Sequence, residues 1–524
     1  VEFGSYISFA EPSETIDLLS PSEFINFANT KNIAASGNPI PVFDTQQKID
    51  EAIANSVDYQ DQVFRTAIAQ NYQLSFRGGA EKVNYYVSGN YLEQEGTAIN
   101  TKFKRYSLRS NINADLSDKL SLKTSINLIR EEGFNNNPGF GASLAIGAIG
   151  FDPTTPIFNS TGEYNRKTTV VGGIQESVLA NPVFLANETN QKSTSNRVQT
   201  NVNLKYNLMS HLDFNISGGI DYANRTFGFF NPNINTGGDI TAGQNTLNDN
   251  NYQYALRLTY DNTFNEKHKL NATAIYEQRF VKSQGFNADG RDFFTPGTGF
   301  DNIGIAEQQT IGSFLSEREL RSVIGRATYN YDSRYLFTTS IRFDQSSVFI
   351  KDQDAVFSSF ALGWNINNEE FFDSKSISTL RLRGSWGETG NELIQTTDAL
   401  NLLRNNPWIP NGGNSGSTAI LPGTRLPNPD LTWETTTQTN IGFDLGVLNN
   451  RFNMSFNYYV KTTEDLLLVQ EVPRFTGRVD QVINAGEVEN KGFDLSISGT
   501  IIQGNDFSWD FSANLSSNEN EIKN

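Results

Sequence analysis

The sequence predicts an all-β fold, a transmembrane antiparallel β-barrel with short turns at one end and long loops at the other. Two observations support this fold class. First, apolar and polar residues alternate one for one over strand-length segments, as in Val202, Leu204 and Tyr206 against Asn201 and Asn203. Successive side chains of a strand point to opposite faces, so one face is apolar and the other polar. Second, very short and very long connections alternate along the chain, which is typical of outer-membrane barrels with short periplasmic turns and long extracellular loops.

The composition agrees with a barrel rather than a helical membrane protein. Of the 524 residues, 37% are hydrophobic, and the mean hydropathy is −0.45. No run reaches the roughly 18 apolar residues that a membrane helix needs. A barrel strand turns only every other side chain to lipid, so its average hydropathy stays low. Aromatic residues are 12% of the chain, which suits barrels with aromatic girdles at both interfaces.

The chemistry-bearing residue types are sparse. Cysteine is absent and only two histidines occur, so disulfides, thiolate metal sites and a cysteine nucleophile are excluded. His211 and His268 fall at tight turns, and no catalytic constellation is found, so we expect neither an enzyme nor a cofactor. A net charge of −17 argues against a nucleic-acid partner, which selects basic surfaces. The acidic stretch Asn248-Asp249-Asn250 leaves calcium as an open alternative, although it lacks the spacing of an EF-hand loop.

Taken in order, the chain offers about seventeen strand candidates. The first occupies residues 1–9, and the last lies near 507–515. The clearest hairpins are 71–78 with 83–93, 102–116 with 119–130, 201–208 with 212–222, 251–264 with 269–281, 321–331 with 335–344, 437–447 with 451–461, and 491–502 with 506–516. The long connections are expected at 131–195, 225–250, 282–319, 388–436 and 462–490. Loops of that length are unusual in a compact domain but common in outer-membrane barrels.

One stretch, residues 12–70, breaks the alternation. Ser20 is a candidate N-cap, with Pro21 at the first helical position and Glu23 three residues on, which predicts a helix over 22–27. Residues 44–54 fit a second helix. We therefore expect a partly helical excursion after the first strand, within one partial barrel spanning 1–524. Because strands begin at residue 1 and a hairpin is unfinished at the end, we expect a piece of a longer protein.

Candidate site residues are of two kinds. Arg105 and Arg109 share one face of their strand, and Arg381 and Arg383 share one face of theirs. An arginine facing lipid at mid-membrane costs roughly 2–4 kcal/mol, so these four are expected to face the lumen. Aromatic residues in the expected loops are candidate contacts for a ligand or a lid protein, with plain loop packing as the competing interpretation. They are Trp408, Phe229, Phe230, Phe293 and Phe294.

An ordered series of short motifs is similar to a known family. The motifs are LSFRGG (74–79), VNYYVS (83–88), YLEQEG (91–96), RYSLR (105–109), YLF (335–337), RFDQSSVF (342–349), LGW (362–364), LRGSWGETGN (382–391), NPDLTWE (428–434) and NKGFD (490–494). With these, the chain resembles the SusC/RagA-like TonB-dependent transporters of the Bacteroidetes outer membrane. Gln345 stands where the family has a glycine.

The resemblance implies parts and partners. Family members carry a TonB box and a globular plug before a barrel of about 22 strands, so the plug and the last strands are expected to lie outside this chain. It further implies a SusD-like surface lipoprotein as a lid, TonB as the energy source, outer-membrane lipid around the barrel, and dimers of transporter–lid pairs. The implied function is active outer-membrane import of oligosaccharides or peptides.

Two alternatives remain open from the residues. A passive porin, or a barrel serving as a scaffold in a surface assembly, would show the same strands, because energy coupling depends on the N-terminal parts. A soluble multi-sheet adhesin would also alternate, but its apolar faces would need a partner sheet.

Overall fold

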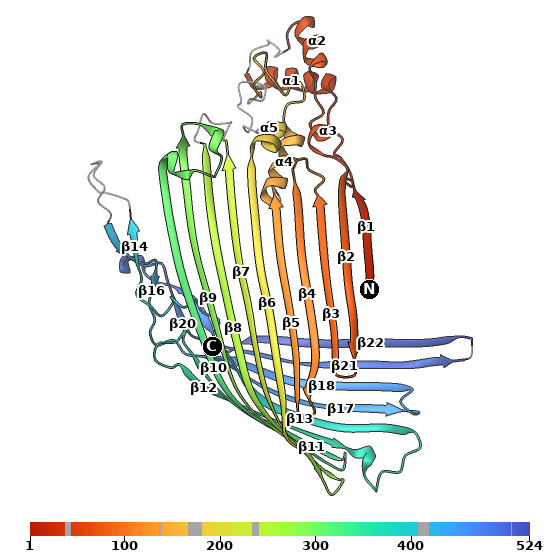
Figure 1. Ribbon diagram of the computed structural model, residues 1–524. Coiled ribbons are helices and arrows are strands. Elements are labelled where there is room, and N and C mark those ends of the chain that lie inside the picture. The colour runs from red at the N-terminus through yellow and green to blue at the C-terminus, as the bar shows by residue number, and fades with distance from the viewer. Residues whose placement is uncertain are drawn as a thin grey trace.

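The computed structural model describes residues 1–36, 43–135, 138–165, 181–232, 240–406, 419–504 and 506–523. Its centre is one sheet of 17 strands (Figure 1), as the alternation predicted. Every neighbouring pair is antiparallel, and each sheet strand pairs with the next sheet strand along the chain. In the described part of the chain, the first strand and the last strand each pair on one side only, so the sheet is an open wall.

The bounds of the sheet strands follow. They are β1 (Glu2–Ala10), β2 (Ala67–Ala80), β3 (Val83–Glu95), β4 (Lys102–Ser117), β5 (Leu120–Phe134), β6 (Asn190–Met209), β7 (Leu212–Asn231), β8 (Thr241–Phe264), β9 (His268–Phe293), β10 (Ala306–Tyr331), β11 (Tyr335–Ser346), β12 (Asp354–Asn365), β13 (Ile377–Asn391), β17 (Glu434–Val447), β18 (Phe452–Glu464), β21 (Glu487–Gln503) and β22 (Ser508–Ile522).

The short turns gather at one end of the sheet because their residues accept left-handed backbone. Asn265 and Glu266 join β8 to β9 at φ of 49° and 60°, and Asp332 and Ser333 join β10 to β11 at 53° and 55°. Two successive residues with positive φ match the right-handed twist of the flanking strands, and Asn and Asp tolerate that region best. These turns fix the register of the hairpins, and with it the face on which every side chain lies.

The register separates an apolar face from a polar face. One row across the sheet reads Leu122, Leu204, Ile216, Leu256, Tyr276, Val323, Phe343. The adjacent row on the other face reads Lys123, Asn203, Ser217, Ala255, Glu277, Ser322, Asp344. At the short-turn end of the apolar face, Tyr331, Tyr335 and Trp364 stack with ring centroids 6.2 and 6.4 Å apart. This arrangement matches a lipid-facing surface with an aromatic girdle.

The strands at the other end are longer than the sequence predicts. β9 and β10 each have 26 residues and β8 has 24, whereas a tilted barrel strand needs about 9–11 residues to cross the membrane. The expected loops at 225–250 and 282–319 are therefore wrong in extent, because only 232–240 and 294–305 connect these strands. Beyond the lipid both faces are polar, so the alternation that indicates a strand disappears there.

Helices lie at the long-loop end (Figure 1). They are α1 (Pro21–Ser36), α2 (Gln46–Ala54), α3 (Tyr59–Val63), α4 (Pro138–Gly150) and α5 (Pro182–Glu188). The predicted cap of α1 is confirmed, since the Ser20 amide donates to Glu23 at 2.9 Å and the Glu23 amide donates to the Ser20 hydroxyl at 3.3 Å. None of the described helices has the length and apolar character to cross a membrane.

Small hydrophobic cores hold the segments at this end, and two of them include residues outside the main sheet. The first joins α3, α4 and α5 through Tyr59, Val63, Leu144, Phe151 and Val183, with the Tyr59 and Phe151 rings 4.9 Å apart. The second surrounds Trp433, with Phe349, Phe357 and Val482. Near it lie the pair β14 (Leu403–Asn406) and β15 (Ala419–Pro422) and the sheet of β16 (Arg425–Leu426), β19 (Leu467–Glu471) and β20 (Asp480–Asn484). Of the 3₁₀ turns, η1 (Pro296–Thr298) and η2 (Ile303–Ile305) lie between β9 and β10, and η4 (Arg474–Thr476) lies between β19 and β20. The turn η3 (Ile366–Asn368) lies at the short-turn end, where Asn368 donates to the Ser333 carbonyl at 2.9 Å.

Candidate functional site

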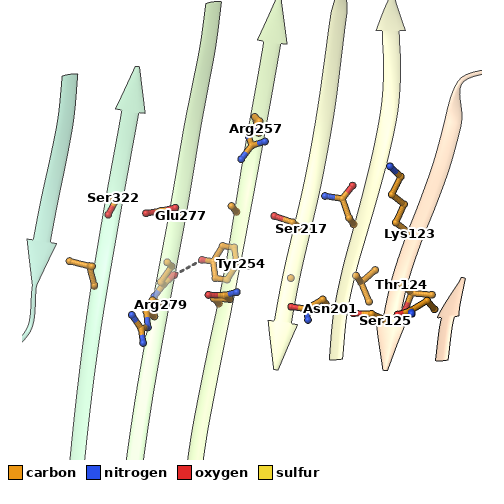
Figure 2. A pocket seen from close by; sticks show the side chains of 18 of the residues that line it. Lys123, Thr124, Ser125, Asn201, Ser217, Tyr254, Arg257, Glu277, Arg279 and Ser322 are labelled. Atoms are coloured by element: carbon orange, nitrogen blue, oxygen red, sulfur yellow. Dashed lines mark hydrogen bonds between the residues drawn. The ribbon is translucent and has the colours of Figure 1, made fainter. Parts of the chain in front are cut away.

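A polar hollow lies on the charged face of the sheet, across β4 to β11. Its volume is about 860 Å³. Figure 2 shows side chains from several strands along it, among them Lys123, Asn201, Ser217, Arg257 and Arg279. Asparagine, glutamine and serine supply most of the remaining polar lining. A wall of amides, hydroxyls and charges binds a hydrated or polar partner, not an apolar one.

Positive charge predominates in this hollow. Arg109, Lys123, Arg257 and Arg279 line it, and no ion pair among the described residues includes any of these four side chains. The one acidic side chain in the lining is Glu277. The hollow is therefore a locally basic surface in a chain whose net charge is −17, and it attracts carboxylate, phosphate or sulfate groups.

The acidic side chain is already engaged by a neighbour. Arg342 on β11 donates from Nη2 to Glu277 at 2.9 Å and to the Ser322 hydroxyl at 2.7 Å, and from Nε to both Asp344 oxygens at 2.7 Å. The pairing of β9, β10 and β11 sets Glu277, Ser322 and Asp344 in one row. Three strands are thereby tied together through a single guanidinium, which presents fixed, directional donors.

The four arginines of the sequence analysis share this polar face by register. Arg109 lies in the row of Asn127 and Gln199, and Arg383 pairs with Asp444 at 3.1 Å. Arg381 donates from Nε to Asn365 at 2.6 Å. Arg105 lies opposite Glu131 in the strand register, and its buried Nε has no hydrogen-bond partner. That this face lines a lumen stays a prediction for all four residues.

The structure places the candidate aromatic residues differently from the sequence. Phe229 and Phe230 belong to β7 and Phe293 ends β9, so their placement in loop tips is wrong. Phe230 and Phe293 are only 6% and 7% exposed and pack together with Ala242 and Ala306. Phe294 is 86% exposed, beyond the end of β9. Ligand contact stays a prediction for Phe294, while Trp408 lies outside the described residues.

The possible cation ligands do not converge. Asn248-Asp249-Asn250 lies within β8, so its three side chains alternate between the two faces of the sheet. Asp249 accepts hydrogen bonds from Arg225 and Ser283, each at 2.7 Å. His211 and His268 sit at turns, with the His268 Nδ1 2.7 Å from the Tyr329 hydroxyl. Within the described ranges, no group of three His, Cys, Asp or Glu side chains could hold a metal ion.

Several residues of the hollow do not stand out in the sequence. Lys123, Arg257, Arg279 and Arg342 were not singled out, although each lies at a polar position of an alternating strand. The apolar–polar alternation along each strand is enough to place these four side chains on the polar face. What brings them together is the register of strands far apart in sequence, which one sequence does not display.

Comparison with known proteins adds an independent observation. A family model described as "TonB dependent receptor-like, beta-barrel" matches residues 150–522. TonB-dependent receptor P3 of Formosa agariphila is 31% identical over 100% of this chain and 51% of its own length. TonB-dependent receptor SusC of Bacteroides thetaiotaomicron is 30% identical over 100% of this chain and 52% of its own. The chain thus spans about half the length of the curated relatives it matches.

Among solved structures, the fold is similar to that of the RagAB peptide transporter. The two superpose with a TM-score of 0.77, at 23% sequence identity, over 99% of this chain and 61% of the other. At that identity the similarity establishes the architecture of the wall.

Proposed function

This chain belongs to the TonB-dependent receptor-like β-barrel family of the outer membrane, and from that premise we propose that it is the wall of an active nutrient importer. The observation that carries this proposal is the match to SusC along the whole chain at 30% identity. The family comprises transporters and receptors rather than enzymes. The cargo is an oligosaccharide or a peptide, the classes implied by the family resemblance.

The proposed mechanism needs parts outside this chain. A plug fills the lumen, and TonB, energised from the inner membrane, pulls on the plug to open a path along the polar wall. The polar face supports this role because it offers hydrogen-bonding groups at each level of the wall, so a hydrated cargo is never left without partners. The basic hollow attracts acidic groups, whether on the plug or on the cargo.

A SusD-like lipoprotein closes the long-loop end in this proposal. The full-chain match to SusC and the shared fold with the RagAB transporter support it. The helices and small sheets at that end give the lid a built surface rather than bare loops (Figure 1).

The test is a pull-down of the full-length protein from outer membranes in mild detergent, with mass spectrometry of the recovered proteins. A stoichiometric SusD-like lipoprotein, together with cargo uptake that stops when TonB is deleted, is the expected result. Recovery without a lid, or uptake that continues without TonB, would instead establish a passive porin or a scaffold. The native mass of the complex also reports whether transporter–lid pairs dimerise.

A further inference from the structure

The apolar face carries a groove centred on Gly89. Its volume is about 670 Å³, and it lies over β1 to β6. One row across the sheet reads Phe3, Leu74, Gly89, Leu108, Leu128, Val198. A side chain is missing from this row only at Gly89, and a Cβ built there would meet no atom within 4 Å. The groove is therefore open space between Leu74 and Leu108, on the face that meets lipid.

The rows above the groove change character in two steps toward the long loops. The next row reads Tyr72, Tyr91, Tyr106, Arg130. The Tyr91 and Tyr106 rings lie 5.0 Å apart, and those of Tyr72 and Tyr91 lie 6.4 Å apart. The row after that reads Gln70, Glu93, Lys104, Glu132. Tyrosines followed by charges mark the boundary between hydrocarbon and headgroups, so the groove lies just inside the leaflet nearer the long loops.

The charges at this boundary leave a positive excess. Four cations, Arg65, Lys102, Lys104 and Arg130, stand beside three carboxylates, Glu93, Glu95 and Glu132. Glu95 lies opposite Lys102 in the register and pairs with Arg65 at 3.6 Å. Glu93 is shared, since it pairs with Lys102 and, at 3.7 Å, with Lys104. Arg130 pairs with Glu132 at 2.7 Å, and its side chain is 55% exposed. Four cations against three carboxylates give one positive charge above an apolar groove, in a chain of net charge −17.

We propose that this groove binds one acylated, phosphate-bearing glycolipid of the outer leaflet. One acyl chain lies over Gly89 between Leu74 and Leu108, and the phosphate meets Arg130 and Lys104. Location selects an acyl chain, because the groove faces the bilayer and its walls are aliphatic and aromatic. Charge selects a headgroup of net negative charge over a zwitterionic one, because guanidinium and ammonium groups bind phosphate oxygens most strongly where the headgroup carries no ammonium group of its own. This site depends on the outer-membrane location alone, not on the proposed transport.

The experiment uses the full-length protein in detergent, with lipid A or phosphatidylethanolamine added as the probe, and counts bound lipids by native mass spectrometry. We expect the wild type to retain one lipid A and no phosphatidylethanolamine at equal concentration. Gly89→Leu fills the groove, and the double variant Arg130→Gln with Lys104→Gln removes the headgroup contacts. Each should weaken lipid A retention at least tenfold.

Gly384→Leu is the matched control. Gly384 lies in the apolar row of Leu362 and Ile441, and the nearest atom to an added Cβ is the Asn440 carbonyl oxygen at 3.9 Å. Its lipid A retention should equal that of the wild type. The proposal is overturned if Gly89→Leu retains lipid A like Gly384→Leu, if the double variant does so, or if the wild type retains both lipids equally. The last comparison needs no variant and holds even if a substitution prevents folding.

Discussion

At the scale of single residues, Arg342 shows how the polar face gains its rigidity. Its guanidinium bonds Asp344, Glu277 and Ser322, and the Asp344 side chain is only 7% exposed. Arg342→Ala leaves that carboxylate without a cation. Breaking a buried pair costs about 3–5 kcal/mol, and the one-third exposure of Arg342 reduces the expected loss to about 2 kcal/mol. Urea unfolding of the barrel in lipid vesicles measures it.

The control for this prediction is Lys205→Ala. Lys205 pairs with Asp213 at 2.9 Å, but both side chains are more than a third exposed. Such a pair contributes at most about 1 kcal/mol. Equal losses for the two variants would show that burial of Asp344 has no energetic consequence.

Gly492 illustrates a steric requirement between strands. A Cβ at this position would lie 2.1 Å from the Ser517 carbonyl oxygen and 2.9 Å from the Tyr459 hydroxyl. Gly492→Ala therefore forces β21 and β22 apart locally, and we expect a loss of about 1–3 kcal/mol. Gly89→Ala, with no atom within 4 Å of the added methyl, should leave stability nearly unchanged. Heat-dependent gel migration of the folded barrel compares the two variants, and equal midpoints would contradict the prediction.

Alternation within one strand was sufficient to assign Arg105, Arg109, Arg381 and Arg383 to a polar face. It was not sufficient to assemble the hollow. The partner of Arg342 on β9, Glu277, lies 65 positions earlier in the sequence, and their proximity depends on two intervening registers. A single sequence specifies the face of a side chain, whereas cross-strand neighbours follow from the pairing of the whole sheet.

At the scale of elements, the apolar and polar faces have opposite tolerance for charge. Ile216 and Ser217 are consecutive on β7, in the apolar row and in the polar row respectively. Ile216→Arg places a guanidinium in hydrocarbon, which costs roughly 2–4 kcal/mol near the bilayer midplane. Ser217→Arg should change the free energy of unfolding by less than about 1 kcal/mol, because the polar face meets water rather than hydrocarbon. Vesicle unfolding measures both, and equal losses would refute the assignment of faces.

The small sheet of β16, β19 and β20 depends on an acidic group that must stay ionised. Arg425 on β16 donates to Asp480 on β20 at 2.7 Å, and this hydrogen bond holds the pKa of Asp480 below its ordinary value. A lowered pKa stabilises the folded form above the unfolded pKa of about 3.9, and the contribution is lost as the pH falls through the folded value.

We therefore expect the Val482 amide on β20 to lose exchange protection as the pH falls below about 4, after correction for the intrinsic rate. Asp480→Asn should show weaker protection at pH 7 and little further loss on acidification. Equal acid sensitivity in the wild type and in Asp480→Asn would show that another group controls this sheet.

The strands that the sequence placed in loops show where pattern recognition ends. Within the bilayer, lipid requires an apolar residue at every second position, so β4, β5 and β7 read clearly. In 241–251, most positions on the apolar face are also polar. Asn248 and Asn250 lie on the same face of β8 as Tyr252 and Tyr254. Water hydrates the side chains on both faces there. The strand is maintained by backbone pairing with its neighbours, which leaves no pattern in the hydropathy of the sequence.

At the scale of the whole molecule, charged rows on the apolar face define how much of the wall meets lipid. On the apolar face of β10, the positions from Val323 toward the short turns are apolar or aromatic. Toward the long loops, the same face carries Arg321, Glu319 and Glu317. Arg130 and Glu132 stand in the corresponding place on β5. The lipid band therefore ends near the middle of the longest strands, and their upper halves form a rim in water that carries the small sheets and helices.

This division predicts which positions of one strand react with a water-soluble reagent. Ile311 and Val323 lie on the same face of β10, 12 positions apart, or about 40 Å along the strand. The sequence has no cysteine, so Ile311→Cys and Val323→Cys each introduce a single thiol. A membrane-impermeant maleimide added to intact cells should label Ile311→Cys rapidly. Val323→Cys should stay unlabelled until the membrane is dissolved and the barrel unfolded, because hydrocarbon excludes the reagent.

Equal protection of both thiols would mean that the rim is buried in lipid or covered by a partner. Equal labelling would mean that the apolar face is not the lipid face.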